Sequence, residues 1–272
     1  MTRQINKDTT LCMSLAAPPS NFGTRFHNFL YEALNLDYIY KAFTTTDLAA
    51  AIGGVRALGI RGCAISMPFK EACIPMVDEL DPSAKAIDSV NTIVNTNGYL
   101  KAYNTDYIAI AKLLNEHQVS SDLVFALRGS GGMAKAVACA LKDAGFKKGY
   151  IVARNEAAGK QLAGLYGFNW APDMTGVQAD MLINVTPIGM AGGADAETLA
   201  FTESAIEQAK VIFDVVALPA ETPLIRYART QGKQVITGAE VFAIQAVEQF
   251  VLYTGIRPSD EVFQQAAKHA RG

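Results

Sequence analysis

The chain has 272 residues, half of them hydrophobic, and a formal net charge of −2. Such a chain can bury a large core and is long enough for two domains. Without a basic stripe it has no electrostatic basis for nucleic-acid binding, and no apolar run reaches the length of a membrane helix. The first eight residues are polar and contain no signal-peptide core, so we expect a cytoplasmic protein.

The cysteines and histidines give no sign of a metal site. The four cysteines form no close-spaced pair and the three histidines are scattered, so their spacing matches no metal-binding pattern. We expect no metal ion, and reduced thiols that pack as small hydrophobic side chains.

The first hundred residues alternate short apolar strands with amphipathic helices. One helix is indicated by an apolar stripe from Phe22 to Ala33, and another by a stripe from Leu48 to Leu58. The dipeptide Asn97-Gly98 predicts a tight hairpin turn between the last two strands of this region. The strands expected here are Leu11–Leu15, Tyr38–Ala42, Gly62–Ser66, Val90–Val94 and Tyr99–Ala102.

Lys70 and Asp106 are the first candidate functional residues. Lys70 follows the Gly62–Ser66 strand after Pro68, and Asp106 follows the hairpin. Because ligand clefts of α/β proteins open at the carboxyl ends of strands, an amine and a carboxylate there could share one cleft and transfer a proton. Taken singly, each also fits an ordinary role, a solvated surface lysine and an acid that helps to cap a helix.

A glycine-rich turn follows the buried strand expected over Asp122–Arg128. The turn runs from Gly129 to Ala134 and leads into a helix expected over Lys135–Ala144. Strand, glycine turn and helix in this order are typical of dinucleotide-binding folds. In such a fold Gly129 permits the tight turn and Gly131 lets backbone amides approach a pyrophosphate.

The end of the next strand predicts which dinucleotide is bound. Tyr150–Ala153 is apolar and is followed by Arg154, where NAD-binding folds carry an acid for the ribose hydroxyl. A guanidinium suits the 2′-phosphate of NADP through paired charge-assisted hydrogen bonds, so NADP is favoured over NAD. Two alternatives stay open. Either Glu156 faces the ribose in place of Arg154, which weakens or reverses the preference, or Arg154 is an ordinary surface residue.

The rest of the chain completes a doubly wound sheet. Further strands are expected at Met181–Val185, Val211–Val215 and Gln234–Thr237, with helices between them. Two last helical patterns, Ala239–Tyr253 and Pro258–Ala270, have no strand of their own to cover.

Sequence motifs occur in a characteristic order along nearly the whole chain. They are Ser66-Met67-Pro68-Phe69-Lys70-Glu71, Ser89-Val90-Asn91-Thr92, Tyr103-Asn104-Thr105-Asp106, the glycine loop, Asn184-Val185-Thr186-Pro187-Ile188-Gly189-Met190 and Gly238 to Gln245-Ala246. In this order they resemble the motifs of the shikimate dehydrogenase family, and in detail those of its divergent shikimate dehydrogenase-like branch.

The resemblance implies an α/β fold with two functional domains. An N-terminal α/β substrate-binding domain, residues 1–104 and 239–272, would also carry the catalytic residues. A Rossmann-type doubly wound NADP domain, residues 105–238, would lie between these segments, and the C-terminal helices would return to the substrate domain.

The resemblance also implies roles for individual residues. Lys70 and Asp106 correspond to the family's catalytic pair. The residues that correspond to substrate-binding positions, or flank them, are Ser20, Asn21, Thr24, Ser66, Asn91 and Gln245. The residues expected to hold NADP are Gly129, Ser130, Gly131, Gly132, Met133, Ala134, Arg154, Asn155, Thr186, Val216 and Gly238.

Several positions depart from the family pattern. Asn21 and Gly23 stand where the family usually has a Ser-x-Ser pair for the substrate carboxylate, and Ala64 and Ala217 replace a usual asparagine and tyrosine. Fewer polar partners imply altered specificity or slow turnover. A second basic residue that the family usually carries near Arg154 is missing, which weakens the expectation of tight NADP binding.

Together, the residues and the resemblance predict an NADP-dependent oxidoreductase that interconverts shikimate, or a close hydroxylated cyclic carboxylate, and its 3-dehydro ketone. The resemblance places this activity in aromatic amino acid biosynthesis. Lys70 and Asp106 would manage the alcohol proton, and the sequence does not assign the base between them. The alternatives are a quinate-type or aminoshikimate-type dehydrogenase, and a dinucleotide-binding regulatory protein with little turnover. The expected partner is a small cyclic hydroxy acid, without nucleic-acid or membrane partners.

Overall fold

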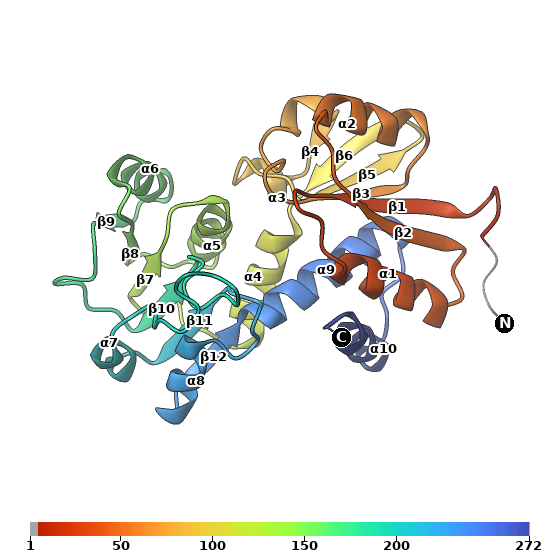
Figure 1. Cartoon of the computed structure of the whole chain (residues 1–272). Helices are drawn as coiled ribbons and strands as arrows, with labels where there is room; N and C mark the ends of the chain where they lie inside the picture. Colours follow the sequence, from red (N-terminus) through yellow and green to blue (C-terminus); the bar gives the residue numbers. More distant parts are fainter. Residues whose placement is uncertain (1–4, 272) are drawn as a thin grey trace. The chain divides into compact units, whose positions relative to one another are not determined.

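The computed structural model describes residues 5–271, so residues 1–4 and 272 of the predicted substrate domain lie outside the described residues. The chain forms two compact units, both drawn in Figure 1. Unit 1 contains the residues up to Thr105 and those from Gln245 onward, and unit 2 contains Asp106–Ile244. The chain thus leaves unit 1 once and returns to it once. No helix among the described residues is both long and apolar enough to cross a membrane.

Unit 1 is built on a mixed six-stranded sheet with the strand order β2-β1-β3-β5-β6-β4. The pairs β1·β2, β1·β3 and β4·β6 are parallel, whereas β3·β5 and β5·β6 are antiparallel. The elements are β1 (Thr10–Leu15), α1 (Phe22–Ala33), β2 (Tyr38–Phe43), α2 (Leu48–Ala57), β3 (Gly62–Ile65), a 3-10 turn (Ile74–Met76), β4 (Glu79–Leu80), α3 (Pro82–Lys85), β5 (Thr92–Thr96), β6 (Tyr99–Tyr103) and α10 (Asp260–Arg271).

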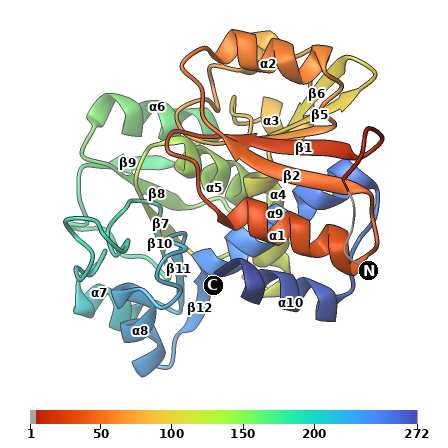
Figure 2. The same cartoon turned by 45° about the vertical axis from the view of Figure 1, so that its right-hand side comes forward.

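Helices cover both faces of this sheet. On one face α2 inserts Ile52 and Val55 into an apolar core made with β1, β3, β5 and β6. On the other face lie α1, α10 and the C-terminal part of α9 (Gly238–Thr254), which both views show on the side opposite α2 (Figures 1 and 2). Gly62 makes this packing possible, because a Cβ there would lie 2.3 Å from the ring of Tyr253.

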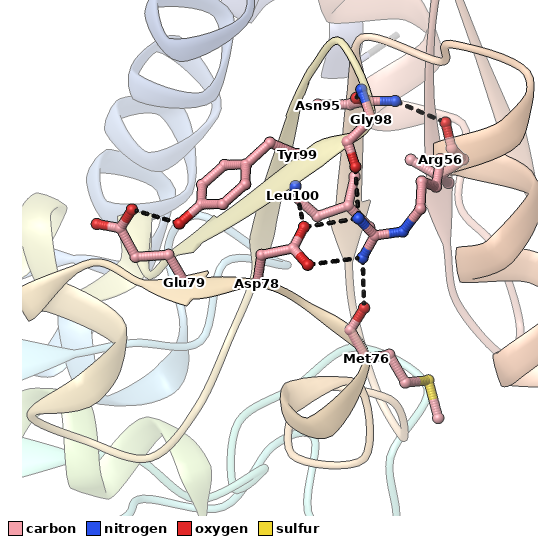
Figure 3. A network of polar contacts seen from close by, with 9 residues as sticks. Arg56, Met76, Asp78, Glu79, Asn95, Gly98, Tyr99 and Leu100 are labelled. Carbon is pink, nitrogen blue, oxygen red and sulfur yellow. Dashed lines mark hydrogen bonds and ion pairs between the residues drawn. The ribbon is translucent and has the colours of Figure 1, made fainter.

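A polar network fixes the β5–β6 hairpin to the end of α2 (Figure 3). Asn97 and Gly98 both have positive φ, as a tight two-residue turn requires, so the predicted hairpin is confirmed. Arg56 binds the carboxylate of Asp78 at 2.6 Å and donates to the carbonyl of Gly98, while Asp78 accepts from Leu100 N at 2.7 Å. The Arg56 guanidinium holds the pKa of Asp78 below its ordinary value. One arginine therefore ties a helix to the hairpin and to the segment before β4.

Unit 2 is built on a fully parallel six-stranded sheet with the order β12-β11-β10-β7-β8-β9. Numbered within the unit this is the 3-2-1-4-5-6 order of dinucleotide-binding folds, so the predicted doubly wound sheet is confirmed. Both views place α5 and α6 on one side of the sheet and α7 and α8 on the other (Figures 1 and 2). The elements are α4 (Thr105–Glu116), β7 (Phe125–Arg128), α5 (Gly132–Asp143), β8 (Gly149–Val152), α6 (Glu156–Tyr166), β9 (Asn169–Ala171), β10 (Met181–Asn184), α7 (Glu203–Gln208), β11 (Val211–Asp214), α8 (Pro223–Thr230) and β12 (Gln234–Thr237).

One helix begins earlier than the sequence predicts. We expected a glycine turn up to Ala134 and a helix from Lys135, but α5 begins at Gly132. Gly131 has extended backbone angles and serves as the N-cap, which glycine does well, so the next residue can already be helical. The turn that separates β7 from α5 is therefore only Gly129 to Gly131.

Candidate substrate and cofactor sites

Asn91 is the centre of a buried polar network in unit 1. Its Nδ2 donates to Thr105 Oγ1 at 3.0 Å, and its Oδ1 accepts from Thr105 N at 2.8 Å. The Thr105 hydroxyl lies 3.3 Å from Gln245 Oε1, to which it can donate. All three side chains are buried. The network therefore joins Asn91 and Gln245, which the sequence predicts to hold substrate, through a residue that the sequence analysis did not select.

Gln249 supports the same network from one helical turn beyond Gln245. Its Nε2 donates to the carbonyl of Asn91 at 3.3 Å, and the same carbonyl accepts from Ile65 N at 2.7 Å. Thr105 and Gln249 were missed because a buried threonine and a helical glutamine carry no special pattern alone. Their signal is the i, i+4 spacing of Gln245 and Gln249 and the adjacency of Thr105 to Asp106.

Lys70 and Asp106 are both linked by the main chain to this network. Lys70 lies half-buried in the turns after β3, and its carbonyl accepts from Val90 N, next to Asn91, at 2.9 Å. Asp106 is buried in the first turn of α4, directly after Thr105. An acid in that turn is stabilised by the helix dipole. That the two side chains act on one substrate stays a prediction.

The loop predicted to bind a carboxylate begins beside the Lys70 loop. Ala17 N donates to Met67 O at 3.1 Å, and Met67 directly follows the exposed Ser66. The predicted carboxylate residues lie beyond this contact: Ser20 and Asn21 are exposed, Asn21 is the N-cap of α1, and Thr24 is half-buried in the first turn of α1. Asn21 makes no capping hydrogen bond with its side chain. Its amide is thus not committed to the helix end.

Replacement of Gly23 by a larger residue is restricted by a neighbouring ring and not by the backbone conformation. It lies within α1, and a Cβ there would meet the Tyr40 ring at 3.3 Å. Tyr40 is itself confined, because its ring stacks on His27 with centroids 4.4 Å apart. A serine hydroxyl at position 23, as in the usual family pair, therefore requires the Tyr40 ring to move by a few tenths of an ångström.

In unit 2, Gly129 occupies a position that only glycine fits well. Its φ is +128°, and a Cβ would lie 2.7 Å from Val185 Cγ2. Gly131 and Gly132 differ, because a Cβ at either would meet no atom within 4 Å. Ala134 is fully buried in α5. The turn thus leaves open space above the first amides of a 12-residue helix, an arrangement suited to an anion.

The three polar residues that follow β8 have different structural roles. Arg154 is exposed just beyond the strand. Asn155 is the N-cap of α6, and its Oδ1 accepts from Ala158 N at 3.1 Å. Glu156 pairs with Lys160 at 2.7 Å along the same helix. This pairing favours Arg154 over Glu156 as the residue that faces a ribose.

Asn184 and Asp214 form a buried pair that holds two cofactor candidates. Asn184 accepts from the Thr186 hydroxyl at 2.6 Å and donates to Asp214 Oδ1 at 3.0 Å. Asp214 Oδ1 also accepts from Val216 N at 3.1 Å, and its Oδ2 accepts from the Thr222 hydroxyl at 2.6 Å. Residues at the ends of β10 and β11 thereby fix the loops that carry Thr186 and Val216.

Gly238 packs against the second of these loops. A Cβ there would lie 2.4 Å from the main chain of Val215 and Val216. Any other residue would push α9 away from the loop after β11. Gly238 therefore has a packing role. This role does not test the prediction that Gly238 also contacts the cofactor.

We expect the buried Asp214 to make the stability of unit 2 fall as pH rises from acid to neutral. Burial raises the pKa of Asp214 from 3.8 to about 6. Between these pH values the folded state keeps a proton that the unfolded state has released, so this contribution to stability is complete below pH 3.8 and is lost as pH rises through about 6. The loss amounts to about 3 kcal/mol.

Urea unfolding of the protein and of Asp214→Asn, measured from pH 4 to pH 7, tests this expectation. The chain has one tryptophan, Trp170, which lies in β9, so its fluorescence reports on unit 2. Asp122→Asn, at an exposed position of the same unit, is the matched control. The free energy of unfolding of the unchanged protein should fall relative to Asp214→Asn as pH rises. Parallel pH profiles would show that Asp214 does not titrate in this range.

No three His, Cys, Asp or Glu side chains within residues 5–271 lie close enough to hold a metal ion. The site geometry instead combines a buried polar network in one unit with the strand, glycine turn and helix of a dinucleotide-binding fold in the other. A mixed-sheet α/β unit joined to a doubly wound parallel unit of the dinucleotide-binding kind defines the structural class of the chain.

Comparisons with known proteins identify the family. A family model described as the shikimate dehydrogenase substrate binding domain matches residues 22–93. A shikimate dehydrogenase-like protein of Haemophilus influenzae is 60% identical over 267 residues, which cover 98% of each chain. A solved structure of a shikimate 5-dehydrogenase-like protein has a TM-score of 0.97 and 59% identity, and covers 99% of this chain and 100% of that one.

A more distant structure of the same family carries ligands. Shikimate 5-dehydrogenase from Thermus thermophilus, solved with NADP(H) and shikimate, has a TM-score of 0.85 at 28% identity, and the match covers 96% of this chain and 99% of that one. This chain belongs to the shikimate dehydrogenase family. The resemblance read from the motifs, including the shikimate dehydrogenase-like branch, is thereby confirmed, as is the predicted fold class.

Proposed function

We propose that this protein is an NADP-dependent dehydrogenase that interconverts shikimate, or a close hydroxylated cyclic carboxylate, and its 3-dehydro ketone. We further propose that unit 1 binds the substrate and that unit 2 binds the cofactor. When bound, NADP supplies the acceptor for the hydride that leaves the alcohol carbon. The protein's own residues must hold the substrate hydroxyls and remove one proton.

The observation that carries the proposal is the buried network of Asn91, Thr105 and Gln245. It presents amide and hydroxyl groups in one hydrogen-bonded set, which suits recognition of a polyhydroxylated ring. The Lys70 carbonyl accepts from Val90 N, the residue before Asn91, and Asp106 directly follows Thr105. In the proposed reaction this pair removes the alcohol proton, one residue as the base and the other orienting the oxygen.

The residues of unit 2 fit NADP. The open space over Gly131 and Gly132 admits a pyrophosphate close to the first amides of α5. Gly129 provides the tight turn that brings β7 directly to that helix. Arg154 extends from the end of the neighbouring strand, where it would meet the ribose 2′-phosphate.

The loop predicted to bind the carboxylate supports two alternative functions. Asn21 replaces a hydroxyl with an amide, and Gly23 supplies no side chain. A quinate-type or aminoshikimate-type substrate would suit a site with these changes, and a regulatory protein would bind the dinucleotide with little turnover. For shikimate itself we propose weaker turnover than a full pair of serines would give.

Turnover with a panel of cyclic hydroxy acids tests the proposed function. Shikimate, quinate and aminoshikimate are each mixed with the protein and NADP, and NADPH formation is followed by its absorbance. We expect shikimate to be oxidised and the other two to react more slowly. Tight NADP binding without turnover of any of the three would favour the regulatory alternative instead.

A preference for NADP over NAD should depend on Arg154. Loss of a charge-assisted hydrogen bond costs about 1.5–3 kcal/mol, so Arg154→Ala should reduce the preference by about tenfold or more. Dissociation constants of both cofactors, measured by calorimetry for the protein and the variant, give the ratio. Arg226→Ala is the matched control, because it removes an arginine of unit 2 that pairs with Glu197. Equal constants for NADP and NAD in the unmutated protein would sink the assignment.

A further inference from the structure

A second arginine, Arg128, lies at the carboxyl edge of the unit 2 sheet beside Arg154. Arg128 is the last residue of β7 and is in register with Val152, the last residue of β8. Gly129 N donates to Val152 O at 2.9 Å, so the two strands stay paired up to the point where both arginines emerge. Arg154 follows Val152 by two residues. Adjacent strand ends therefore bring two guanidinium groups to one corner of the sheet.

The two positive charges lie close enough to influence one another. Burial lowers the pKa of Arg128, and the charge of Arg154 lowers it further, while the exposed Asp195 opposes both effects. Among the ion pairs of residues 5–271, none includes Arg128 or Arg154. Like charges that are held together without a paired acid destabilise a protein unless an anion joins them.

Arg128 is also held in one orientation. It is half-buried, and its Nη1 donates to the carbonyl of Ala200 in the segment before α7. A guanidinium has five N–H donors, so this bond leaves most of the planar fork available. An arginine fixed in this way loses little side-chain entropy when it binds a phosphate, an anion that its planar fork can bind through two hydrogen bonds.

We propose that Arg128 is a second binding residue for the 2′-phosphate of NADP and shares that phosphate with Arg154. The inference rests on the proposed cofactor, but it does not rest on any substrate. A phosphate between the two guanidinium groups would neutralise both charges and accept hydrogen bonds from each. Two arginines at adjacent strand ends would then bind the 2′-phosphate more tightly than a single exposed arginine.

Binding of 2′,5′-ADP and of 5′-ADP, measured by calorimetry, tests the inference without any turnover. We expect Arg128→Gln to lower the affinity for 2′,5′-ADP by about tenfold or more. The affinity for 5′-ADP, which lacks the 2′-phosphate, should change by less than about twofold. Arg128→Lys, which keeps the charge but loses the fork, should show a smaller loss. Arg226→Gln is the matched control and should change neither constant.

The double variant Arg128→Gln with Arg154→Gln distinguishes shared binding from independent effects. If one phosphate contacts both residues, the losses should not add. An equal loss for both probes would mean that Arg128 only tethers the Ala200 segment, and an unchanged constant for 2′,5′-ADP in Arg128→Gln would also overturn the inference. If 2′,5′-ADP binds the unmutated protein no better than 5′-ADP, the 2′-phosphate site is refuted, whereas shikimate turnover with NAD would keep the dehydrogenase function.

Discussion

Lys70→Ala and Asp106→Ala should each lower kcat for shikimate by about 100-fold or more, the usual scale for the loss of positioned acid–base help. The reason is the proposed role of the pair in removing the alcohol proton. The main chain of Lys70 is bonded to Val90, next to Asn91, and Asp106 directly follows Thr105. Each substitution therefore removes a side-chain group while the hydrogen bonds of Asn91, Thr105 and Gln245 can persist. NADP affinity should survive, because the cofactor residues lie in other segments.

Steady-state kinetics and NADP calorimetry on both variants separate chemistry from binding. Lys85→Ala and Asp122→Ala are matched controls, since both positions are exposed and neither belongs to a candidate site. A pH profile of kcat for Lys70→Ala and Asp106→Ala then assigns the base, because the variant without the base loses the rise of rate with pH. Near-normal turnover in both variants would falsify the catalytic assignment.

Much of the fold follows from local sequence patterns. The alternation of apolar strands with helices gave the parallel sheet of unit 2, and Asn97-Gly98 gave the hairpin, because such residues adopt positive φ readily. The short strands β4 and β9 were not predicted, since two or three residues cannot show a periodic pattern. The start of α5 was misplaced because glycines favour turns locally, whereas here Gly131 caps a helix.

The candidate sites could be predicted only where a residue type is distinctive by itself. Lys70, Asp106 and Arg154 are charged residues at strand ends or helix starts, so sequence reasoning selects them. Thr105 becomes interesting only through its hydrogen bonds to Asn91 and Gln245, which join residues far apart in the chain. From the sequence alone, Arg128 is indicated only as the end of a buried strand. Only the pairing of β7 with β8 places it beside Arg154.

Gly129→Ala should destabilise unit 2 by about 4 kcal/mol. A non-glycine residue at φ +128° carries strain of about 1–3 kcal/mol, and the overlap of the new Cβ with Val185 Cγ2, at 2.7 Å, adds about 1–3 kcal/mol. Relief of that overlap requires β7 or the Val185 loop to move. NADP affinity should also fall, because the turn that orients the first amides of α5 is distorted.

Gly132→Ala separates the structural effect from the binding effect. Gly132 is the first residue of α5 and a Cβ there meets no protein atom within 4 Å, so stability should stay the same or rise by a few tenths of a kcal/mol. If a pyrophosphate occupies the open space over the turn, the added methyl group should still lower the affinity for NADP. Urea unfolding followed by Trp170 fluorescence and NADP calorimetry on both variants measure the two effects separately. A Gly129→Ala protein as stable as the unmutated one would contradict the strain argument, and unchanged NADP affinity in Gly132→Ala would place the pyrophosphate elsewhere.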